Sequence, residues 1–247
     1  MNDISVSSFE ISEHGGIDPE TDSPRFVAKH LSAYYFVKPY ADGRVLEIGF
    51  GDGYGSSFLA GKAREVKAID LFDKNVKAAS SKYIKPNLEF SCMNATNLKW
   101  ADHYFDLTIS FQVIEHIPEA LLPVYIREIK RVTRPGGTIC LSTLNLKKNR
   151  KPGKVYKKAP HHDREFEPSE FMDFLSPFFS KIDMYGLYPT SKHSFFERIK
   201  KAGIFSFLPE SIDPVKAFYQ KIGVDDFRWL KKQVIDDSID LMAVCRN

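Results

Sequence analysis

The chain has 247 residues, a length that suits one large domain, and its 43% apolar content is enough for a sizeable core. Its net charge is +3, yet residues 147–158 (KKNRKPGKVYKK) hold six lysines, one arginine and no acidic residue. The rest of the chain is therefore mildly acidic, which argues against a broad nucleic-acid-binding surface and indicates one local loop that attracts anions.

The hydrophobic pattern alternates between short strand-like runs and longer helical runs. Continuous apolar strands separated by helices are typical of a mainly parallel sheet that helices cover on both faces. We therefore expect an α/β fold with a seven-stranded sheet. The predicted helices occupy residues 23–40, 54–63, 74–84, 118–133 and 168–179, and the predicted strands occupy residues 44–50, 65–71, 87–95, 105–113, 137–145, 180–188 and 238–247.

A long stretch separates the last two predicted strands, where a tight hairpin would suffice. It contains eight aromatic residues between Phe195 and Trp229, so we expect a helical cap or a surface for a partner. The expected organisation is a single domain over residues 1–247, with an N-terminal helical segment at 1–40, a basic lid loop at 146–166 and an aromatic-rich insertion or cap at 194–235.

The cysteines and the N-terminus bear on the cellular compartment. Cys92, Cys140 and Cys245 lie far apart, with no CxxC spacing, in apolar runs that resemble strands, so we expect buried free thiols in a reducing compartment. Residues 1–16 lack a basic start and an apolar core, and no run approaches the roughly 18 apolar residues of a membrane span. A cytoplasmic protein without stable membrane insertion is expected.

Four glycines fall within seven residues of the stretch RVLEIGFGDGYGSS, residues 44–57. Such a cluster between a first parallel strand and its helix marks a tight turn that usually admits a nucleotide-like ligand. Tyr54 stands where a dinucleotide-binding fingerprint needs its third glycine, and Glu47 precedes the first glycine by two positions. An acid so close disfavours a pyrophosphate and favours a cationic ligand.

With three further motifs in order, this stretch resembles the class I S-adenosylmethionine-dependent methyltransferases, most closely the type 11 family. The similar motifs are VLEIGFGDGYGS, VKAIDL, FDLTISFQVIEHI and REIKRVTRPGGTICLSTLN, and the resemblance covers residues 26–190. It implies a Rossmann-like fold and S-adenosyl-L-methionine as the cofactor.

The resemblance also implies roles for particular residues. The backbone of the glycine turn passes under the cofactor, and Asp70 accepts both ribose hydroxyls, since a carboxylate offers two oxygens at diol spacing. Asn94 stands where the family commonly has an acid that receives the adenine amino group. The expected cofactor-binding residues are Glu47, Gly49, Gly51, Gly53, Asp70, Leu71, Asn94, Ala95 and Gln112.

Structural roles compete with several of these assignments. Glu47 orders either the turn alone or also the ammonium end of the cofactor, Asn94 is alternatively a simple turn residue, and Asp70 a helix cap. Near the first helix, His30 and Tyr34 match a segment that faces the cofactor in related enzymes, but Ala33 replaces its arginine. Packing of Tyr34 into the core is the alternative.

Methyl transfer from a sulfonium is an in-line displacement, so alignment supplies much of the rate and no metal is expected. A hydroxyl acceptor also needs a group that takes its proton. The candidate bases are His116, which follows the fourth predicted strand, and His161 and His162 in the segment HHDREFEPSEF. That segment resembles one in methyltransferases of bacterial surface-glycan and lipopolysaccharide synthesis.

Alternatives remain open here too. His116 is otherwise a helix-starting histidine held by Glu115 or by backbone, Arg164 is an anion clamp, and Arg164 and Glu165 alternatively pair to fix the start of a helix. The motifs of zinc hydrolases, serine esterases and nucleoside triphosphatases are absent, and SFQV replaces the NPPY-type motif of base methylation.

We therefore expect an S-adenosylmethionine-dependent methyltransferase that acts on a small or carrier-bound polar acceptor, with a sugar hydroxyl favoured and nucleic acid excluded. A phosphate-containing acceptor would meet the basic residues Lys147, Lys148, Arg150 and Lys151. The alternatives are a quinone or lipid methyltransferase and a cofactor-binding protein without catalysis. The methylated atom and the oligomeric state are not predicted.

Overall fold

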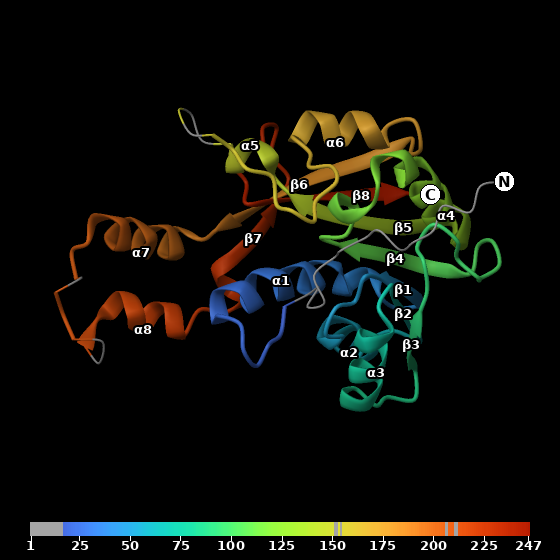
Figure 1. Cartoon of the computed structure of the whole chain (residues 1–247), viewed down its shortest axis with the longest axis horizontal. Helices are drawn as coiled ribbons and strands as arrows, with labels where there is room; N and C mark the ends of the chain where they lie inside the picture. Colours follow the sequence, from blue (N-terminus) through green and yellow to red (C-terminus); the bar gives the residue numbers. More distant parts are fainter. Residues whose placement is uncertain (1–16, 151–152, 154, 206, 210–211) are drawn as a thin grey trace.

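The computed structural model describes residues 17–150, 153, 155–205, 207–209 and 212–247, and within them one mixed eight-stranded sheet forms the centre of the molecule (Figure 1). The strand order is β3-β2-β1-β4-β5-β8-β6-β7. The strands are β1 (Arg44–Ile48), β2 (Glu65–Asp70), β3 (Leu88–Cys92), β4 (Phe105–Phe111), β5 (Thr133–Leu144), β6 (Lys181–Pro189), β7 (Phe227–Leu230) and β8 (Asp240–Arg246).

Strands β1 to β5 run parallel, while β8 lies antiparallel between β5 and β6. Strand β1 lies between β2 and β4, so the connections leave the sheet in opposite directions at this point. In open α/β sheets, ligands bind outside the carboxyl ends of the strands at such a switch point. The predicted Rossmann-like α/β fold is thus confirmed, and the carboxyl ends of β1, β2, β4 and β5 define the edge where a site is expected.

The helices cover both faces of the sheet, as the alternation of apolar residues predicts. On one face Tyr34 and Leu59 pack with Val45, and on the other Tyr125 packs with Leu46. Helices α1, α2 and α3 cover the first face, and α4 and α6 cover the second. The helices are α1 (Pro24–Val37), α2 (Tyr54–Ala60), α3 (Asp73–Lys82), α4 (Leu122–Val132), α5 (Leu146–Asn149), α6 (Pro168–Leu175), α7 (Ser191–Ala202) and α8 (Pro214–Gln220).

The sheet has eight strands where seven were predicted. The additional strand, β7, lies inside the predicted insertion and pairs antiparallel with β6, from Gly186 opposite Leu230 to Pro189 opposite Phe227. It has only four residues, FRWL, and lies at the edge of the sheet. A pattern of four residues is too short to predict a strand, and it is the pairing with β6 that stabilises β7.

Helices α7 and α8 form an arm that extends away from the sheet between β6 and β7 (Figure 1). At the base of the arm, Phe218 and Phe227 pack with Leu187 of β6 and Ala28 of α1. Phe195 of α7 and Phe207, which lies between α7 and α8, are exposed, at 58% and 77%. Residues 206 and 210–211 of the predicted insertion lie outside the described residues, as do residues 1–16 of the predicted N-terminal segment.

One cysteine differs from the prediction. Cys140 and Cys245 are buried, but Cys92 is exposed, because it ends β3 at the edge of the sheet. The apolar run that forms β3 therefore does not bury its last residue, Cys92. Within the described part of the chain, no helix combines the length and the apolar character needed to cross a membrane.

Candidate active site

The glycine turn follows β1 at the carboxyl edge of the sheet. Gly49, Gly51 and Gly53 have φ values of 74°, 60° and 96°, in the left-handed region that favours glycine. A Cβ on Gly49 would lie 2.3 Å from Val113 Cγ2, and one on Gly53 would lie 2.9 Å from the Cβ of Ala79. At these two positions the fold of the chain itself requires glycine, whether or not a ligand passes over the turn.

Asp70 ends β2 beside this turn, with its side chain oriented by three donors. The backbone N–H of Gly51 donates to Oδ2 at 3.2 Å, and the N–H of Phe72 and the amide of Asn75 donate to Oδ1 at 3.0 and 3.2 Å. Burial raises the pKa of this carboxyl group despite these hydrogen bonds. Leu71 follows it and is half-buried. The carboxylate is thus held rigidly where the sequence predicts the ribose-binding acid.

Glu47 is buried within β1 and is held from two helices. Tyr34 of α1 donates its hydroxyl to Oε1 at 2.5 Å, and the Ser56 hydroxyl of α2 donates to Oε2. Burial raises the pKa of Glu47 to about 7, and the neighbouring Asp70 carboxylate adds to the rise. One turn before Tyr34, burial lowers the pKa of His30 to about 3, so this imidazole is neutral.

Asn94, Ala95 and Gln112 also lie at the carboxyl ends of strands. The Asn94 side-chain oxygen accepts from the backbone N–H of Thr96 at 2.9 Å, so it already stabilises its own turn. Ala95 is buried. Gln112 has a φ of 55°, and its backbone N–H donates to the Ser142 carbonyl at 3.0 Å. These contacts fix the loops after β3 and β4 without requiring a ligand.

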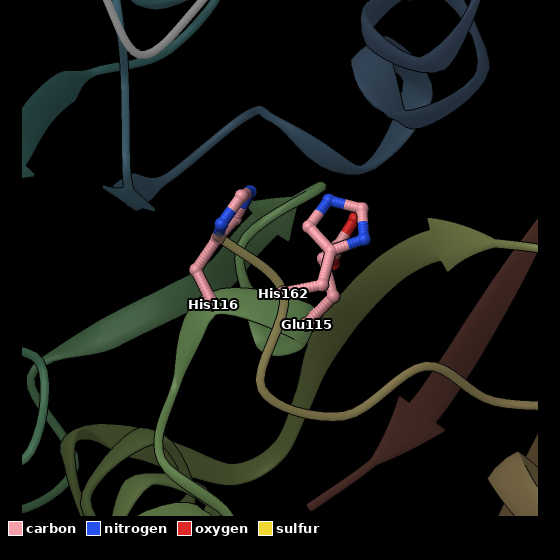
Figure 2. A group of neighbouring side chains, drawn as sticks. All are labelled: Glu115, His116 and His162. Carbon is pink, nitrogen blue, oxygen red and sulfur yellow. The ribbon is translucent and has the colours of Figure 1, made fainter. Parts of the chain in front are cut away.

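Three chemically active side chains meet just beyond β4. Glu115 and His116 belong to a 3₁₀ turn, Ile114–His116, and His162 reaches them from a segment distant in sequence (Figure 2). The ligand-type atoms of Glu115, His116 and His162 all lie within 4.8 Å of one another. The two imidazole rings stand edge to face, with centroids 4.8 Å apart. We call these three residues the Glu115 cluster.

Each histidine of the cluster is oriented through Nδ1. His116 Nδ1 lies 3.0 Å from the backbone carbonyl of His161, and His162 Nδ1 lies 2.5 Å from Oε1 of Glu165. Glu165 is buried and also accepts from the Tyr156 hydroxyl at 2.5 Å. Of the three predicted bases, the structure therefore brings His116 and His162 together, while His161 takes part through its backbone.

Backbone hydrogen bonds hold the His162 segment against the turn after β4. The N–H groups of Asp163 and Arg164 donate to the Glu115 carbonyl at 2.7 and 3.3 Å. The Arg164 side chain pairs with Glu119 at 2.8 Å, so the pair with Glu165 that was considered as an alternative is not formed. Arg164 thus helps to fix the segment, and the partner of Glu165 is His162.

The Glu115 side chain is buried and connects the cluster to three other elements. It accepts a hydrogen bond from the Thr143 hydroxyl of β5 at 3.1 Å. Burial raises its pKa to about 8; the Asp240 carboxylate adds to the rise and Lys29 opposes it. Lys29 of α1 pairs with Asp240 of β8 at 2.9 Å. Sequence reasoning did not select Lys29 or Asp240, because only the fold brings them together.

The predicted basic lid loop lies near this edge. Lys147 pairs with Asp236 at 2.6 Å and Arg150 pairs with Glu167 at 3.0 Å, both as exposed ion pairs. Such pairs contribute only about 0–1 kcal/mol, so a stronger anion can compete for these side chains. Lys148 is exposed, and Lys151 lies outside the described residues.

Comparisons with known proteins agree on one class. Residues 46–141 match the type 11 family model described as a methyltransferase domain. A probable S-adenosylmethionine-dependent methyltransferase of Mycobacterium tuberculosis is 33% identical over 162 residues, which cover 65% of this chain and 57% of that protein. A ubiquinone biosynthesis O-methyltransferase of Parvibaculum lavamentivorans is 31% identical over 127 residues, 49% of each chain. The crystal structure of a SAM-dependent methyltransferase from Archaeoglobus fulgidus has a TM-score of 0.59 at 15% identity, covering 91% of this chain and 95% of that one.

The fold and the matched domain are those of class I S-adenosylmethionine-dependent methyltransferases. These enzymes use S-adenosyl-L-methionine as the cofactor. Residues 46–141 of this chain thus match a type 11 methyltransferase domain, and the described fold is similar to that of solved S-adenosylmethionine-dependent methyltransferases. The chain spans 57% and 49% of the two curated relatives, roughly half their length.

The residues at the glycine turn fit this cofactor. Glu47 and Asp70 are two buried carboxylates close enough for one to raise the pKa of the other. Ionising both carboxyl groups of such a buried pair costs free energy unless a positive charge lies near them. The cofactor carries an ammonium and a sulfonium, together with a ribose diol that matches the two oxygens of Asp70.

Proposed function

We propose that this protein transfers a methyl group from S-adenosylmethionine to a hydroxyl group of a small or carrier-bound acceptor. The observation that carries the proposal is the position of the Glu115 cluster, at the same sheet edge as Glu47 and Asp70. Val113 links the two, because it contacts the glycine turn at Gly49 and precedes Glu115 by two residues.

Each part of the site has a separate task in this proposal. Asp70 and the glycine turn bind the cofactor, which supplies an electrophilic methyl group when bound. Glu47 compensates the positive charge at the amino-acid end of the cofactor. The Glu115 cluster positions the acceptor hydroxyl and favours loss of its proton, which together with alignment supplies the rate.

The nature of the acceptor beyond its hydroxyl is also a proposal. We infer a sugar hydroxyl, as in glycan biosynthesis, because the site approaches the acceptor with polar and charged side chains. A phosphate group on that acceptor would bind Lys147, Lys148 and Arg150, which are all exposed, with Lys147 and Arg150 in exposed ion pairs. The free thiols Cys140 and Cys245 suit the reducing cytoplasm, where we place the reaction.

A second candidate, a quinone or other lipophilic acceptor, is favoured by the arm. Phe195, Ile204, Phe207 and Ile212 expose large apolar side chains on it, and one curated relative carries the name of a ubiquinone biosynthesis enzyme. The buried aromatic residues at the base of the arm pack with one another around His193, which favours a structural role for that part of the insertion.

The test measures formation of S-adenosylhomocysteine against an acceptor panel of sugars, nucleotide sugars, quinols and acyl-carrier conjugates, with an acceptor-free blank. Calorimetry first establishes that the protein binds the cofactor. We expect turnover with a hydroxyl acceptor from the polar part of the panel. Turnover with quinols alone would select the second candidate, and cofactor binding without any turnover would favour a non-catalytic binding protein.

A further inference from the structure

We propose that Glu115, His116 and His162 bind a divalent transition-metal ion, which in turn holds the hydroxyl of the acceptor. The role of the ion rests on the proposed function, but binding of the ion does not. The three ligand-type atoms lie within 4.8 Å of one another. Three ligands at about 2.0–2.2 Å from a tetrahedral ion stand about 3.3–3.6 Å apart, so side-chain rotations that bring these atoms about 1 Å closer complete the site.

The outer hydrogen bonds of the two histidines are those of metal ligands. A carbonyl oxygen faces Nδ1 of His116, and the Glu165 carboxylate faces Nδ1 of His162. Both partners accept hydrogen bonds, so Nδ1 of each ring serves as the donor and Nε2 is the nitrogen left to face an ion. Histidines that bind metals almost always donate their other ring N–H to a carboxylate or a backbone carbonyl.

The third ligand, Glu115, is a buried carboxylate, which is costly without a counter-charge. The cation that faces it from α1, Lys29, forms its close ion pair with Asp240 at 2.9 Å. A divalent ion between Glu115 and the two imidazoles would compensate this charge directly. The Thr143 hydroxyl, 3.1 Å from Oε2, would keep the carboxylate oriented toward the ion.

The ligand types narrow the choice of ion. Two imidazoles and one carboxylate suit zinc, iron(II) or cobalt(II), whereas magnesium and calcium prefer sites made of oxygen atoms. Three protein ligands leave a coordination position open, as in catalytic rather than structural metal sites. The acceptor oxygen would take that position, where the ion lowers the pKa of its hydroxyl.

The reaction balances with these participants. The acceptor hydroxyl gives up its proton to solvent water, and its oxygen forms the new C–O bond to the methyl group. The electron pair of the broken C–S bond stays on the sulfur of the cofactor, which becomes neutral. No metal was expected from the sequence, because an in-line displacement from a sulfonium does not itself require one. The three proposed ligands come from two segments that only the fold brings together.

The test is titration of the full-length, tag-free protein with Zn²⁺, Co²⁺ and Mg²⁺ after treatment with a chelator. We expect one Zn²⁺ or Co²⁺ per chain at this site, bound at least about 100-fold more tightly than Mg²⁺, and a Co²⁺ absorption band typical of nitrogen and oxygen ligands. Glu115→Gln and His162→Asn should each weaken Co²⁺ binding about 100-fold, and Glu165→Gln about 10-fold to 100-fold.

The matched control is His103→Asn. His103 lies in the connection between β3 and β4, with its ring 3.5 Å from the Thr133 carbonyl at the start of β5. Asparagine tolerates its φ of 63°. This variant should bind Co²⁺ as the native protein does. Calorimetric binding of S-adenosylmethionine by every variant would verify that each one is folded.

Two results would overturn the metal site: no stoichiometric binding of Zn²⁺ or Co²⁺, or equal loss of binding in His103→Asn and the ligand variants. Methyl transfer that persists in a chelator with no ion bound would reject the role of the ion in holding the acceptor, while leaving the proposed function intact. Stoichiometric binding that depends on Glu115 and His162, without transfer to any acceptor, would establish the site and contradict the proposed function instead.

Discussion

Tyr34 of α1 donates its hydroxyl to the buried carboxylate of Glu47 in β1 at 2.5 Å. The Tyr34 ring also fills the space beside Gly55, where a Cβ would come within 2.0 Å of it. Five residues earlier, Lys29 on the same helix pairs with Asp240 of β8. One helix thus packs against the glycine turn through Tyr34 and reaches Asp240, a neighbour of Glu115, through Lys29.

The first prediction follows from that hydrogen bond. Tyr34→Phe keeps the ring and its edge-to-face contact with Phe111, but it leaves the buried Glu47 carboxyl group without one donor. We expect a loss of about 1–3 kcal/mol in the free energy of unfolding, together with weaker cofactor binding. Urea denaturation and calorimetry measure the two effects.

The matched control for this change is Tyr35→Phe on the exposed face of α1, where Tyr35 is 51% exposed. It removes the same hydroxyl and should change stability by only a few tenths of a kcal/mol. If the two variants were equally stable, the Tyr34–Glu47 hydrogen bond would not stabilise the fold.

The second prediction concerns pH and Glu47, whose pKa rises from 4.5 to about 7 on folding. The folded state then binds more protons than the unfolded state between these values, so stability should fall as the pH rises from 4.5 through 7. The expected contribution of this one group is about 3 kcal/mol. A cationic cofactor stabilises the ionised form, so cofactor affinity should rise over the same range.

Glu47→Gln should remove this contribution from the difference in unfolding free energy between pH 5 and pH 8. The control is Asp225→Asn, whose carboxylate is 96% exposed in its side chain. Urea denaturation of the native protein and both variants at pH 5 and pH 8 measures this difference in unfolding free energy. A difference that stays the same in Glu47→Gln would mean that this carboxyl group titrates normally.

The third prediction concerns cofactor recognition. Asp70→Ala should weaken S-adenosylmethionine binding by about 1.5–3 kcal/mol, because hydrogen bonds to a charged acceptor are lost. Asp73→Ala, an exposed acid at the start of α3, serves as the control and should bind normally. Calorimetry with NADH should give no signal. Tight NADH binding, or normal cofactor binding by Asp70→Ala, would contradict the assigned role of Asp70.

The sequence predicted the parallel half of the sheet well, because each motif combines an apolar strand with a turn that only a few residue types tolerate. It also selected His116 and His162 individually. It did not predict that they meet, nor that Glu165 orients one of them, since a contact between distant segments leaves no periodic pattern. The Lys29–Asp240 pair spans 211 residues, and only the packing of α1 over the sheet edge creates it.

The fourth prediction concerns the basic loop. Replacing Lys147, Lys148, Arg150 and Lys151 together by glutamine should raise the KM of a phosphate-containing acceptor and reduce its dependence on ionic strength, because long-range attraction is screened by salt. Cofactor affinity should not change. Lys200→Gln with Lys201→Gln, on α7, removes charge elsewhere and should leave the KM alone. A KM that is independent of salt in the native protein would remove the reason to expect phosphate.

The fifth prediction distinguishes a polar acceptor from a lipophilic one through the arm. Phe195 and Phe207 are the two aromatic residues among the four large apolar side chains that the described part of the arm exposes, at 58% and 77% of their surface. Scattered exposed apolar side chains are normal on a protein surface and need not contact a partner. Phe195→Ser with Phe207→Ser should therefore leave the KM of a soluble sugar acceptor within about twofold. For a quinol or lipid-linked acceptor presented in detergent micelles, loss of two apolar contacts of about 1–2 kcal/mol each should raise the KM at least about tenfold.

The control for a general change in surface polarity is Val155→Ser, which replaces a side chain that is 91% exposed in the basic loop. A tenfold rise with the micellar acceptor in the double variant alone would assign the arm to acceptor binding and favour the second candidate, whereas equal KM values would leave the arm without a role in the reaction.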